Sequence, residues 1–523
     1  MISIKHETDL ERLRQIALLQ ETEIGHLHRR IKVLLTELAK TTGRDESRLQ
    51  LELKLLQEQL DRRINDLYGR SSEKRPADGE MEKPKDAEKK AKTGHGPREQ
   101  INLPVVEKLH ELDEADKACP KCGGALNELV GQTEDSEEID IVHRSYRIMK
   151  HKRKKYVCTC GECVETAIGP QKLIVGGRYS VDFGVDVAVS KYADHLPLSR
   201  QVKQMARHGL GVNAQTLWDQ LWAMHGHLKA TYEALHDYVL ASPVVGADET
   251  TWGFLKKAES KDWWAWSVTR HDAVFYKIMS TRSAKAAAEL LKDYGGVVMA
   301  DGYSAYGALA KELVEPSRAG PRFTLANCWA HGRRKFVECE THYPVAKEAI
   351  EIIRKLYDVE RRAKEATERM DPTGAAGDCE AARLEVLARM RREESAQIVE
   401  KFYEWVESQT ALPKSGLGIA LAYMMKYRDG LEKFLQNPRI PLDNNHTERG
   451  MRPVAVGRKN HYGSKSLRGT QVAAMFYSLI ESAKLAGLNP VEYLGTAVRR
   501  AIDNPGTVTL PCDLAREQAA AQA

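Results

Sequence analysis

Two short apolar runs, each followed by an aspartate, constrain the fold of this chain more than any other feature. The first run delivers Asp248, and the second, Val-Val-Met-Ala, is followed by Asp301. Between them, residues 262–269 and 274–278 are rich in aromatic and β-branched side chains, which favour strands. Residues 283–294 have apolar residues at helical spacing. The order strand, strand, strand, helix, strand predicts an α/β domain with Asp248 on its first strand and Asp301 at the end of its fourth.

These two aspartates indicate a metal site. A carboxylate at the end of a buried strand loses hydration free energy unless a partner compensates for that loss. A divalent cation shared by two carboxylates does so directly, and carboxylate oxygens are the ligands that hard cations prefer. Asp248 and Asp301 therefore predict one cation site at the end of the sheet.

A third candidate carboxylate, Glu448, lies far downstream. Asp443 or Asn444 can cap a helix whose first turns contain Glu448. Pro453 is expected to kink or end that helix. Glu481 is a rival third acid, but it lies in a later apolar helix beyond a basic loop.

The three acids and their flanks resemble a known catalytic centre. Asp248, Asp301 and Glu448, with the Asn-Asn pair before Glu448 and the arginine after it, resemble the catalytic triad of DDE transposases. More narrowly, the chain resembles the large transposase of the insertion sequence 66 family almost end to end. This resemblance implies an RNase H-like α/β catalytic domain and two Mg²⁺ or Mn²⁺ ions. Asp248 would bridge both ions, Asp301 would hold one, and Glu448 the other.

The implied activity is that of a DNA transposase. Such an enzyme binds the terminal inverted repeats of an insertion sequence, hydrolyses a phosphodiester, and joins the freed 3′ hydroxyl to target DNA. Neither step needs a protein nucleophile, because two ions about 4 Å apart stabilise charge on the attacking and leaving oxygens. Glu249 is expected to point to the other face of its strand and to be structural. Two alternatives stay open: a non-catalytic DNA-binding protein, and an RNase H-like structure-selective nuclease.

The chain is too long for a single core, so several domains are expected. Asp301 and Glu448 are 147 residues apart, against 53 for Asp248 and Asp301. A large all-helical insertion is therefore predicted inside the catalytic domain. The predicted catalytic domain comprises residues 241–336 and 441–505, and the insertion comprises residues 337–440.

Five of the nine cysteines lie close together, which is typical of a metal site rather than of a disulfide framework. Cys119 and Cys122, followed by two glycines, form one knuckle of a structural Zn²⁺ site. The second knuckle draws on Cys158, Cys160 and Cys163. Cys160 with Cys163 repeats the two-residue spacing, whereas the family resemblance favours Cys158, so the choice stays open.

Two modules that contact double-stranded DNA are predicted before the catalytic domain. Residues 101–175 form the zinc ribbon, with a basic strand that ends in Arg153, Lys154 and Lys155. Residues 176–240 have the pattern helix, glycine turn, helix, with Asn213 as the cap of the second helix. Either module also has a plainer interpretation, as a solvated strand or a packing unit.

Two further basic clusters flank the predicted acids. One follows the Cys-x-x-His sequence of Cys328 and His331, which is expected to contact DNA rather than metal. The other follows Glu448 and interleaves with aromatic residues. The predicted DNA-binding residues of these clusters are Arg333, Arg334, Lys335, Arg449, Arg452, Arg458 and Lys459.

The remaining predictions concern the two ends of the chain and the linker after the first segment. Residues 1–70 carry a leucine-zipper-like repeat, which predicts a coiled coil and a homodimer or higher oligomer. Residues 71–100 are charged and almost without apolar residues, as in a flexible linker. Residues 506–523 are expected to form a loose tail. The family resemblance adds small accessory proteins as partners.

The composition bears on location more than on partners. The net charge of +5 is mild, so the local clusters carry the argument for nucleic acid. No run of about 18 apolar residues occurs, and no signal-peptide core is present. We therefore expect a cytoplasmic protein, associated with the nucleoid and without a membrane partner.

Overall fold

The computed structural model describes residues 145–157, 162–255, 263–311, 322–370 and 378–522. It also describes short pieces between residues 33 and 58 and the single residues 106, 121 and 139. Residues 72–145 fall into a unit separate from the rest. The predicted linker, nearly all of the predicted zinc ribbon before residue 145, and most of the predicted coiled coil therefore lie outside the described residues.

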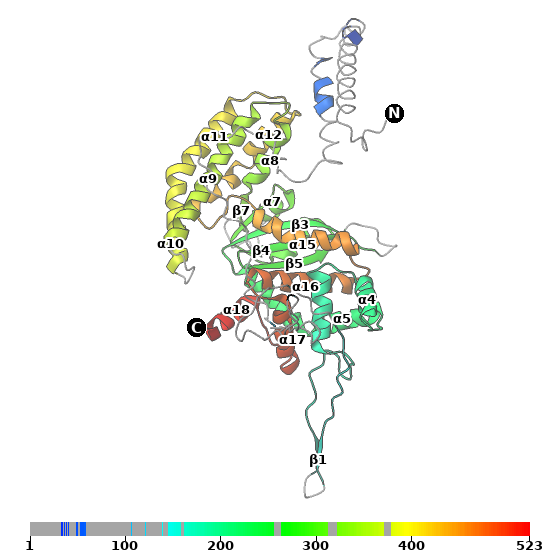
Figure 1. Cartoon of the computed structure of the whole chain (residues 1–523). Helices are drawn as coiled ribbons and strands as arrows, with labels where there is room; N and C mark the ends of the chain where they lie inside the picture. The colour runs from blue at the N-terminus through cyan, green and yellow to red at the C-terminus, as the bar shows by residue number, and fades with distance from the viewer. Residues whose placement is uncertain are drawn as a thin grey trace. The chain divides into compact units, whose positions relative to one another are not determined.

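A five-stranded mixed sheet carries the two aspartates, with the strand order β5-β4-β3-β6-β7 (Figure 1). β3, β4 and β5 are antiparallel, whereas β6 and β7 run parallel to β3. The expected succession of three strands, a helix and a fourth strand is present, with α6 (Ala284–Leu291) as the helix. The strands are β3 (Val244–Trp252), β4 (Trp263–Arg270), β5 (Ala273–Met279), β6 (Val297–Ala300) and β7 (Thr324–Asn327).

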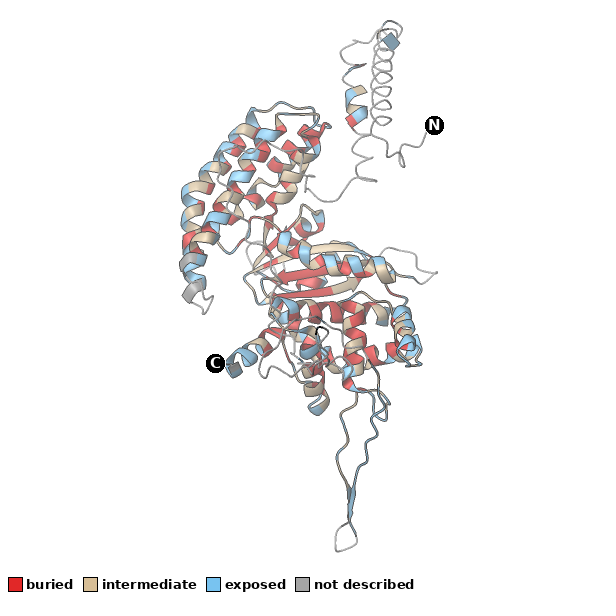
Figure 2. Cartoon of the chain, viewed as in Figure 1, coloured by how far each residue is buried: buried red, intermediate tan, exposed pale blue. Residues whose placement is uncertain are grey.

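Helices cover both faces of this sheet and one of its edges. On one face, Tyr306 of α7 (Ser304–Lys311) contacts Trp266 of β4, next to α6. The opposite face is covered by α15 (Asn445–His461), which contacts β3 and β4. The burial pattern in Figure 2 follows from this layering, because β4 and β5 are mostly red, whereas β3 is partly tan.

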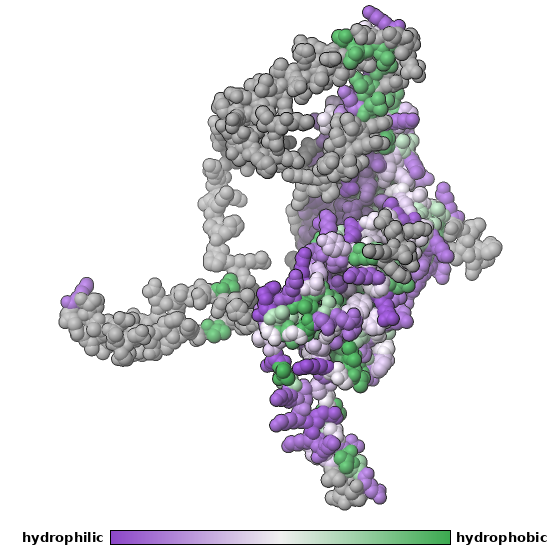
Figure 3. Space-filling model, turned by 90° about the vertical axis from the view of Figure 1, so that its right-hand side faces the viewer, coloured by the Kyte–Doolittle hydropathy of each residue, from purple (hydrophilic) through white to green (hydrophobic). Residues whose placement is uncertain are grey.

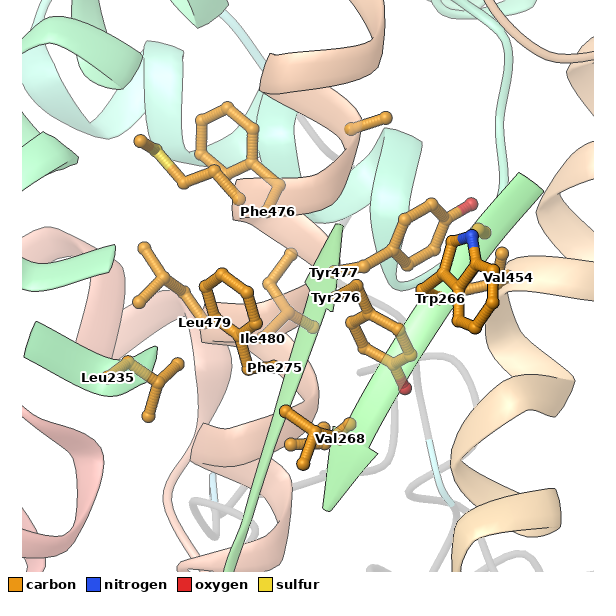
Figure 4. Packing of buried hydrophobic residues seen from close by; sticks show 14 of the residues in the cluster. Leu235, Trp266, Val268, Phe275, Tyr276, Val454, Phe476, Tyr477, Leu479 and Ile480 are labelled. Carbon is orange, nitrogen blue, oxygen red and sulfur yellow. The ribbon is translucent and has the colours of Figure 1, made fainter. Parts of the chain in front are cut away.

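The free edge of β5 is closed by serines of α16 (Leu467–Leu485). Ser478 Oγ accepts a hydrogen bond from Tyr276 N at 2.8 Å, and Ser482 Oγ accepts one from Val274 N at 3.0 Å. The two serines are one helical turn apart on α16. The two amides are two residues apart on β5, so both point out of the same edge of the sheet. Figure 4 shows the apolar side chains of α16 packed around β4 and β5. The hydroxyl groups of α16 thus satisfy backbone amides of β5 that no neighbouring strand pairs with on this edge.

The helix-turn-helix pattern forms α4 (Leu198–Arg207) and α5 (Ala214–Leu240), after α3 (Val181–Tyr192). Asn213 caps α5 as predicted, because its side chain accepts a hydrogen bond from Thr216 N at 2.8 Å. Most of α5 is a core helix with one face buried against the five-stranded sheet and α16. Only the first turn of α5 is largely exposed.

The chain between β7 and α15 is helical and has its own core, built around Trp329, Phe336 and Phe402. These helices lie together in Figure 1. They are α8 (Trp329–Cys339), α9 (Ala346–Met370), α10 (Asp378–Met390), the π-helix η3 (Arg391–Ser395), α11 (Ala396–Ser408), α12 (Gly416–Lys426), α13 (Arg428–Leu431) and α14 (Lys433–Gln436).

Two local expectations differ from the structure. Pro453 was expected to kink or end its helix, and it does not end it, because α15 continues to His461. Residues after Pro505 are not a loose tail, because α17 (Pro490–Asp503) is followed by α18 (Pro511–Gln522). Cys512 and Leu514 of α18 are buried, and this apolar anchor explains the order of the segment.

Ser478→Ala is expected to weaken the sheet edge, because it leaves the buried Tyr276 N–H without its acceptor. The cost is about 1–3 kcal/mol of local stability. Hydrogen-exchange mass spectrometry of peptides covering β5 should show faster exchange. Ser408→Ala, at the exposed end of α11, is the matched control and should leave β5 unchanged. Equal protection of β5 in both variants would contradict the role given to Ser478.

Candidate functional site

Asp301 directly follows β6, as expected, but Asp248 lies in the middle of β3. The expectation that Asp248 ends its strand was wrong, because β3 continues to Trp252. β3 pairs with β6 in parallel through Gly246 and Met299. This is the last pair of the two strands, and Asp248 and Asp301 each lie two residues farther along. A continuation of the register would place their backbones level, at the spacing of about 4.8 Å that separates adjacent strands. The loop after β6 is held by Asn327, whose Nδ2 donates to Asp301 O at 3.3 Å. Asp301 Oδ1 in turn accepts a hydrogen bond from Tyr303 N at 2.9 Å.

The helix that carries Glu448 covers the same face of the sheet as Asp248. A Cβ atom on Gly246 would clash with Thr447 Oγ1 and stand 2.8 Å from Thr269 Oγ1, so only glycine lets α15 approach here. Asp248 is two residues beyond Gly246, and residues at that spacing share a face of the strand. Asp248 therefore points toward the layer formed by α15.

Hydrogen bonds fasten the first turn of α15 to the sheet. Asn444 occupies the cap position, but its side chain donates to Ala247 O at 3.1 Å instead of capping the helix. Asp443 Oδ1 accepts a hydrogen bond from Asn445 N at 3.0 Å. Thr447 Oγ1 lies 2.7 Å from Thr269 Oγ1 on β4. These contacts fix the turn that contains Glu448 beside β3.

The three acids act on one another electrostatically. Burial, followed by the charges of Glu249, Asp301 and Glu448, raises the pKa of Asp248 to about 7, against the hydrogen bond from Glu249 N. Burial and the neighbouring acids thus disfavour the charged form of the Asp248 carboxyl group. A divalent cation at this position would stabilise that charged form.

Glu249 points away from this face, as expected. Its carboxylate accepts two hydrogen bonds from Arg282, at 2.9 and 2.7 Å, and one from Tyr306 at 2.9 Å. Burial raises the pKa of Glu249, whereas the Arg282 and Tyr306 hydrogen bonds oppose that rise. Glu249 is a paired structural acid.

His331 is a neighbour of Glu448 that the sequence did not predict. Its Nε2 lies 3.6 Å from Glu448 Oε1, beyond hydrogen-bond distance. Both Glu448 Oε1 and His331 Nδ1 are buried and have no hydrogen-bond partner within the part of the chain that the structure describes. The Cys-x-x-His spacing brings His331 here, because β7 ends at the edge of the site and α8 begins at once.

Cys328 is a poor metal ligand. Its Sγ accepts a hydrogen bond from Asn444 N at 3.2 Å, and burial raises the pKa of the thiol to about 12. A metal-binding cysteine must be a thiolate. The Cys-x-x-His element therefore packs β7 against α15 through Cys328 and lends only His331 to the site.

The donor set fits a hard cation in chemistry, since it consists of carboxylate oxygens with a buried, unsatisfied oxygen on Glu448. Among the described ranges, no three His, Cys, Asp or Glu side chains already stand close enough to hold one ion. Glu481 is paired with Lys484 at 2.8 Å on α16, along β5, two strands from β3.

The predicted DNA-binding residues fall into three groups. Arg449, Arg452 and Lys459 are exposed and share one stripe of α15 with the exposed Val456. Arg458 turns inward instead, where it donates to Thr251 O and to the hydroxyls of Thr250 and Thr251. It thereby fastens α15 to the end of β3.

The second group lies on α8, and the third lies on and before β1. Arg333, Arg334 and Lys335 are half-buried, and Lys335 Nζ stands 5.0 Å from the ring centre of Tyr423. β1 (Lys155–Val157) pairs with β2 (Val164–Thr166) in a small antiparallel sheet. Arg153, Lys154 and Lys155 are exposed along it, although Arg153 Nε donates to Ala167 O.

Four of the five predicted zinc ligands, Cys119, Cys122, Cys158 and Cys160, lie outside the described residues. Cys163 is described and is an exposed free thiol just before β2.

Comparison with known proteins identifies the family. The model described as "Transposase IS66 family" matches residues 176–472, which span α3 to α16 and all three acids. The chain belongs to the IS66 transposase family. The model described as "zinc-finger binding domain of transposase IS66" matches residues 116–161. That match contains Cys119, Cys122, Cys158 and Cys160 and ends before Cys163.

Relatives of this IS66 transposase occur in Sinorhizobium fredii. The uncharacterized protein y4jD is 32% identical over 411 residues, which cover 76% of this chain and 77% of the relative. The uncharacterized protein y4qI is 30% identical over 416 residues, which cover 76% of this chain and 72% of the relative. In the described part of the chain, no helix is both long and apolar enough to span a membrane.

Asp248→Asn should stabilise the metal-free protein at neutral pH. The folded pKa of Asp248 is about 7, whereas an unfolded aspartate has a pKa of about 4. The parent protein therefore loses stability as the pH rises from about 4 to about 7, because only the unfolded chain releases the proton in that window. Asparagine carries no charge and avoids this loss.

The expected advantage of the variant is of the order of 2 kcal/mol at pH 8, discounted for partial exposure, and it vanishes near pH 4. Urea unfolding at both pH values, followed by the fluorescence of the buried tryptophans beside β3, measures it. A variant that is less stable than the parent at pH 8 would contradict this description of Asp248.

Proposed function

We propose that this protein is a DDE-type DNA transposase with an RNase H-like catalytic domain. It binds the terminal inverted repeats of an insertion sequence and catalyses phosphodiester hydrolysis and 3′-hydroxyl strand transfer. The observation that carries this proposal is the parallel pairing of β3 with β6 up to Gly246 and Met299, which would set Asp248 beside Asp301, together with the glycine that lets the Glu448 helix approach the same face. Membership of the IS66 transposase family supports the same activity.

Asp248, Asp301 and Glu448 would hold Mg²⁺ or Mn²⁺, with Asp248 shared between two ions. Bound ions of this kind stabilise charge on the attacking and leaving oxygens of an in-line displacement. Their binding requires the Asp248 carboxyl to lose its proton, and side-chain rotation to draw the three acids together. The free oxygen of Glu448 is available for this movement.

The exposed stripe of α15 gives DNA a path beside the acids. Arg449 and Arg452 follow Glu448 by one residue and by one turn, and Lys459 lies near the end of the same helix. Exposed guanidinium and ammonium groups at this spacing match the phosphates of a duplex backbone. Arg458 uses Nη1 to hold α15 on β3, and its other guanidinium nitrogens would contact a phosphate.

The zinc ribbon would supply a second DNA contact. Cys119 and Cys122 with two of the three later cysteines would bind a structural Zn²⁺, and the family match supports a zinc finger in this segment. Figure 3 shows that the surface near β1 is mostly hydrophilic. Arg153, Lys154 and Lys155 belong to that surface and would contact phosphates.

Self-association completes the proposal. Residues 1–70 would pair as a coiled coil, so that two copies of the chain hold the two ends of one element. Linker, ribbon, helix-turn-helix region, divided catalytic domain and helical insertion would follow at the boundaries predicted from the sequence. Small accessory proteins of the same element are further proposed partners.

The acids provide the test. Asp248→Asn, Asp301→Asn and Glu448→Gln should each abolish Mg²⁺-dependent nicking of a DNA end, with losses of about a thousandfold or more. Binding of the same end, measured in Ca²⁺ or without metal, should stay within a few-fold of the parent. Glu481→Gln is the matched control, because that acid lies two strands away, and it should cut normally.

The outcome also separates the alternatives. A parent protein that binds DNA ends but never cuts them would support a non-catalytic DNA-binding protein. Cleavage without joining to target DNA would support a structure-selective nuclease. Normal cutting by all three acid variants would refute the assignment of the site.

A further inference from the structure

The helical segment between β7 and α15 reaches directly into the loop that carries Asp301. Tyr427 lies between α12 and α13, and its hydroxyl donates a hydrogen bond to Gly302 O at 2.7 Å. Gly302 is the residue after Asp301. A side chain of the helical segment therefore touches the backbone of a candidate metal ligand.

The ring of Tyr427 is closely fitted to this loop. A Cβ atom on Gly302 would stand 2.9 Å from two ring carbons of Tyr427, so the close approach requires glycine at this position. The ring also packs against Tyr423, at 4.7 Å between ring centres, and Lys426 Nζ lies 4.9 Å from its centre. Contacts within the helical segment thus help to fix the position of the Tyr427 ring.

The same helices also hold the other side of the loop. Asn327 donates to Asp301 O, and Gly430 of α13 packs so closely against Asn327 that an added Cβ would clash with Asn327 Oδ1. Trp329 Nε1 donates to Leu431 O at 2.9 Å. The carbonyls of Asp301 and Gly302 are therefore held by Asn327, which packs on α13, and by Tyr427, which lies between α12 and α13.

A buried arginine fixes the chain that continues to Glu448. Arg391 of η3 is 1% exposed and donates to Phe434 O and Ile440 O, both at 2.9 Å. Its charge is paired with Glu360 of α9 at 2.7 Å. Residues 434–440 are thereby held a few residues before α15. The helical segment that lies between Asp301 and Glu448 in the sequence therefore contacts the chain next to Asp301 and fixes the chain that leads to Glu448.

We propose that Tyr427 is a positioning residue that sets the Asp301 carboxylate level with Asp248, so that the helical insertion determines how tightly the acids bind a divalent cation. This inference rests on the proposed function. The hydroxyl is the decisive atom, because phenylalanine would keep the ring packing and remove only the hydrogen bond to Gly302 O. The released loop would then have to be ordered again each time a cation binds.

Tyr427→Phe should weaken Mn²⁺ binding about threefold to tenfold, which is the effect of losing one neutral hydrogen bond. Electron paramagnetic resonance of free Mn²⁺, titrated into the full-length protein without DNA, measures this directly. The Mg²⁺ concentration needed for half-maximal nicking should rise by the same factor, while nicking at saturating Mg²⁺ stays close to that of the parent.

Tyr403→Phe is the matched control. The Tyr403 hydroxyl donates to Met424 O at 3.4 Å in the same helical bundle, and the hydrogen bond touches neither acid-bearing loop. This variant should bind Mn²⁺ as the parent does. Thermal unfolding of both variants checks that any difference in Mn²⁺ binding does not arise from loss of the fold.

The outcomes separate the two proposals. If Asp301→Asn loses Mn²⁺ binding and Tyr427→Phe binds as tightly as the parent, Tyr427 has no positioning role. Equal weakening in Tyr427→Phe and Tyr403→Phe would also overturn the inference, because the effect would then be one of general packing. If Asp301→Asn binds Mn²⁺ as the parent does, the metal site itself is wrong.

Discussion

The close approach of α15 to β3 at Gly246 is the contact on which the candidate site depends. Any side chain at Gly246 would push Thr447 away from the sheet, and Glu448 would move with it. The threonine pair between α15 and β4 and the Asn444 hydrogen bond to Ala247 then fix the rotation of the helix. One small residue thus permits an acid from a distant segment to face an acid from the sheet.

That arrangement has an electrostatic cost. Burial and like charges raise the pKa of Asp248. Burial also raises the pKa of the neighbouring Glu249, but there the hydrogen bonds from Arg282 and Tyr306 on the opposite face oppose the rise. Adjacent residues of one strand therefore have opposite roles. A paired acid contributes to structure, whereas an unpaired, crowded acid is suited to a cation.

Much of this could be predicted from the sequence, because β-branched runs and the aspartates that follow apolar runs are local signals, although β3 continues past Asp248 to Trp252. The succession of elements, the opposite orientation of Glu249 and the Asn213 cap all followed from such signals. The level register of Asp248 and Asp301 depends on strand pairing and was not visible in the sequence.

Contacts between distant segments could not be predicted. Nothing near Tyr427 indicates that it reaches Gly302, 125 residues earlier in the chain. The inward turn of Arg458 was hidden for the same reason, since a run of basic residues looks alike whether its members face solvent or a strand. At Pro453 the local signal was stronger than its effect: a proline favours a helix end, but α15 packs on the sheet and continues beyond it.

The most direct test of the central claim is a crystal of the full-length protein soaked in Mn²⁺ and measured for anomalous scattering. We expect an anomalous peak between the carboxylates of Asp248 and Asp301, with the Glu448 carboxylate turned toward it at coordinating distance. A peak elsewhere would contradict the account. So would a cation held by the two aspartates with the Glu448 carboxylate beyond coordinating distance.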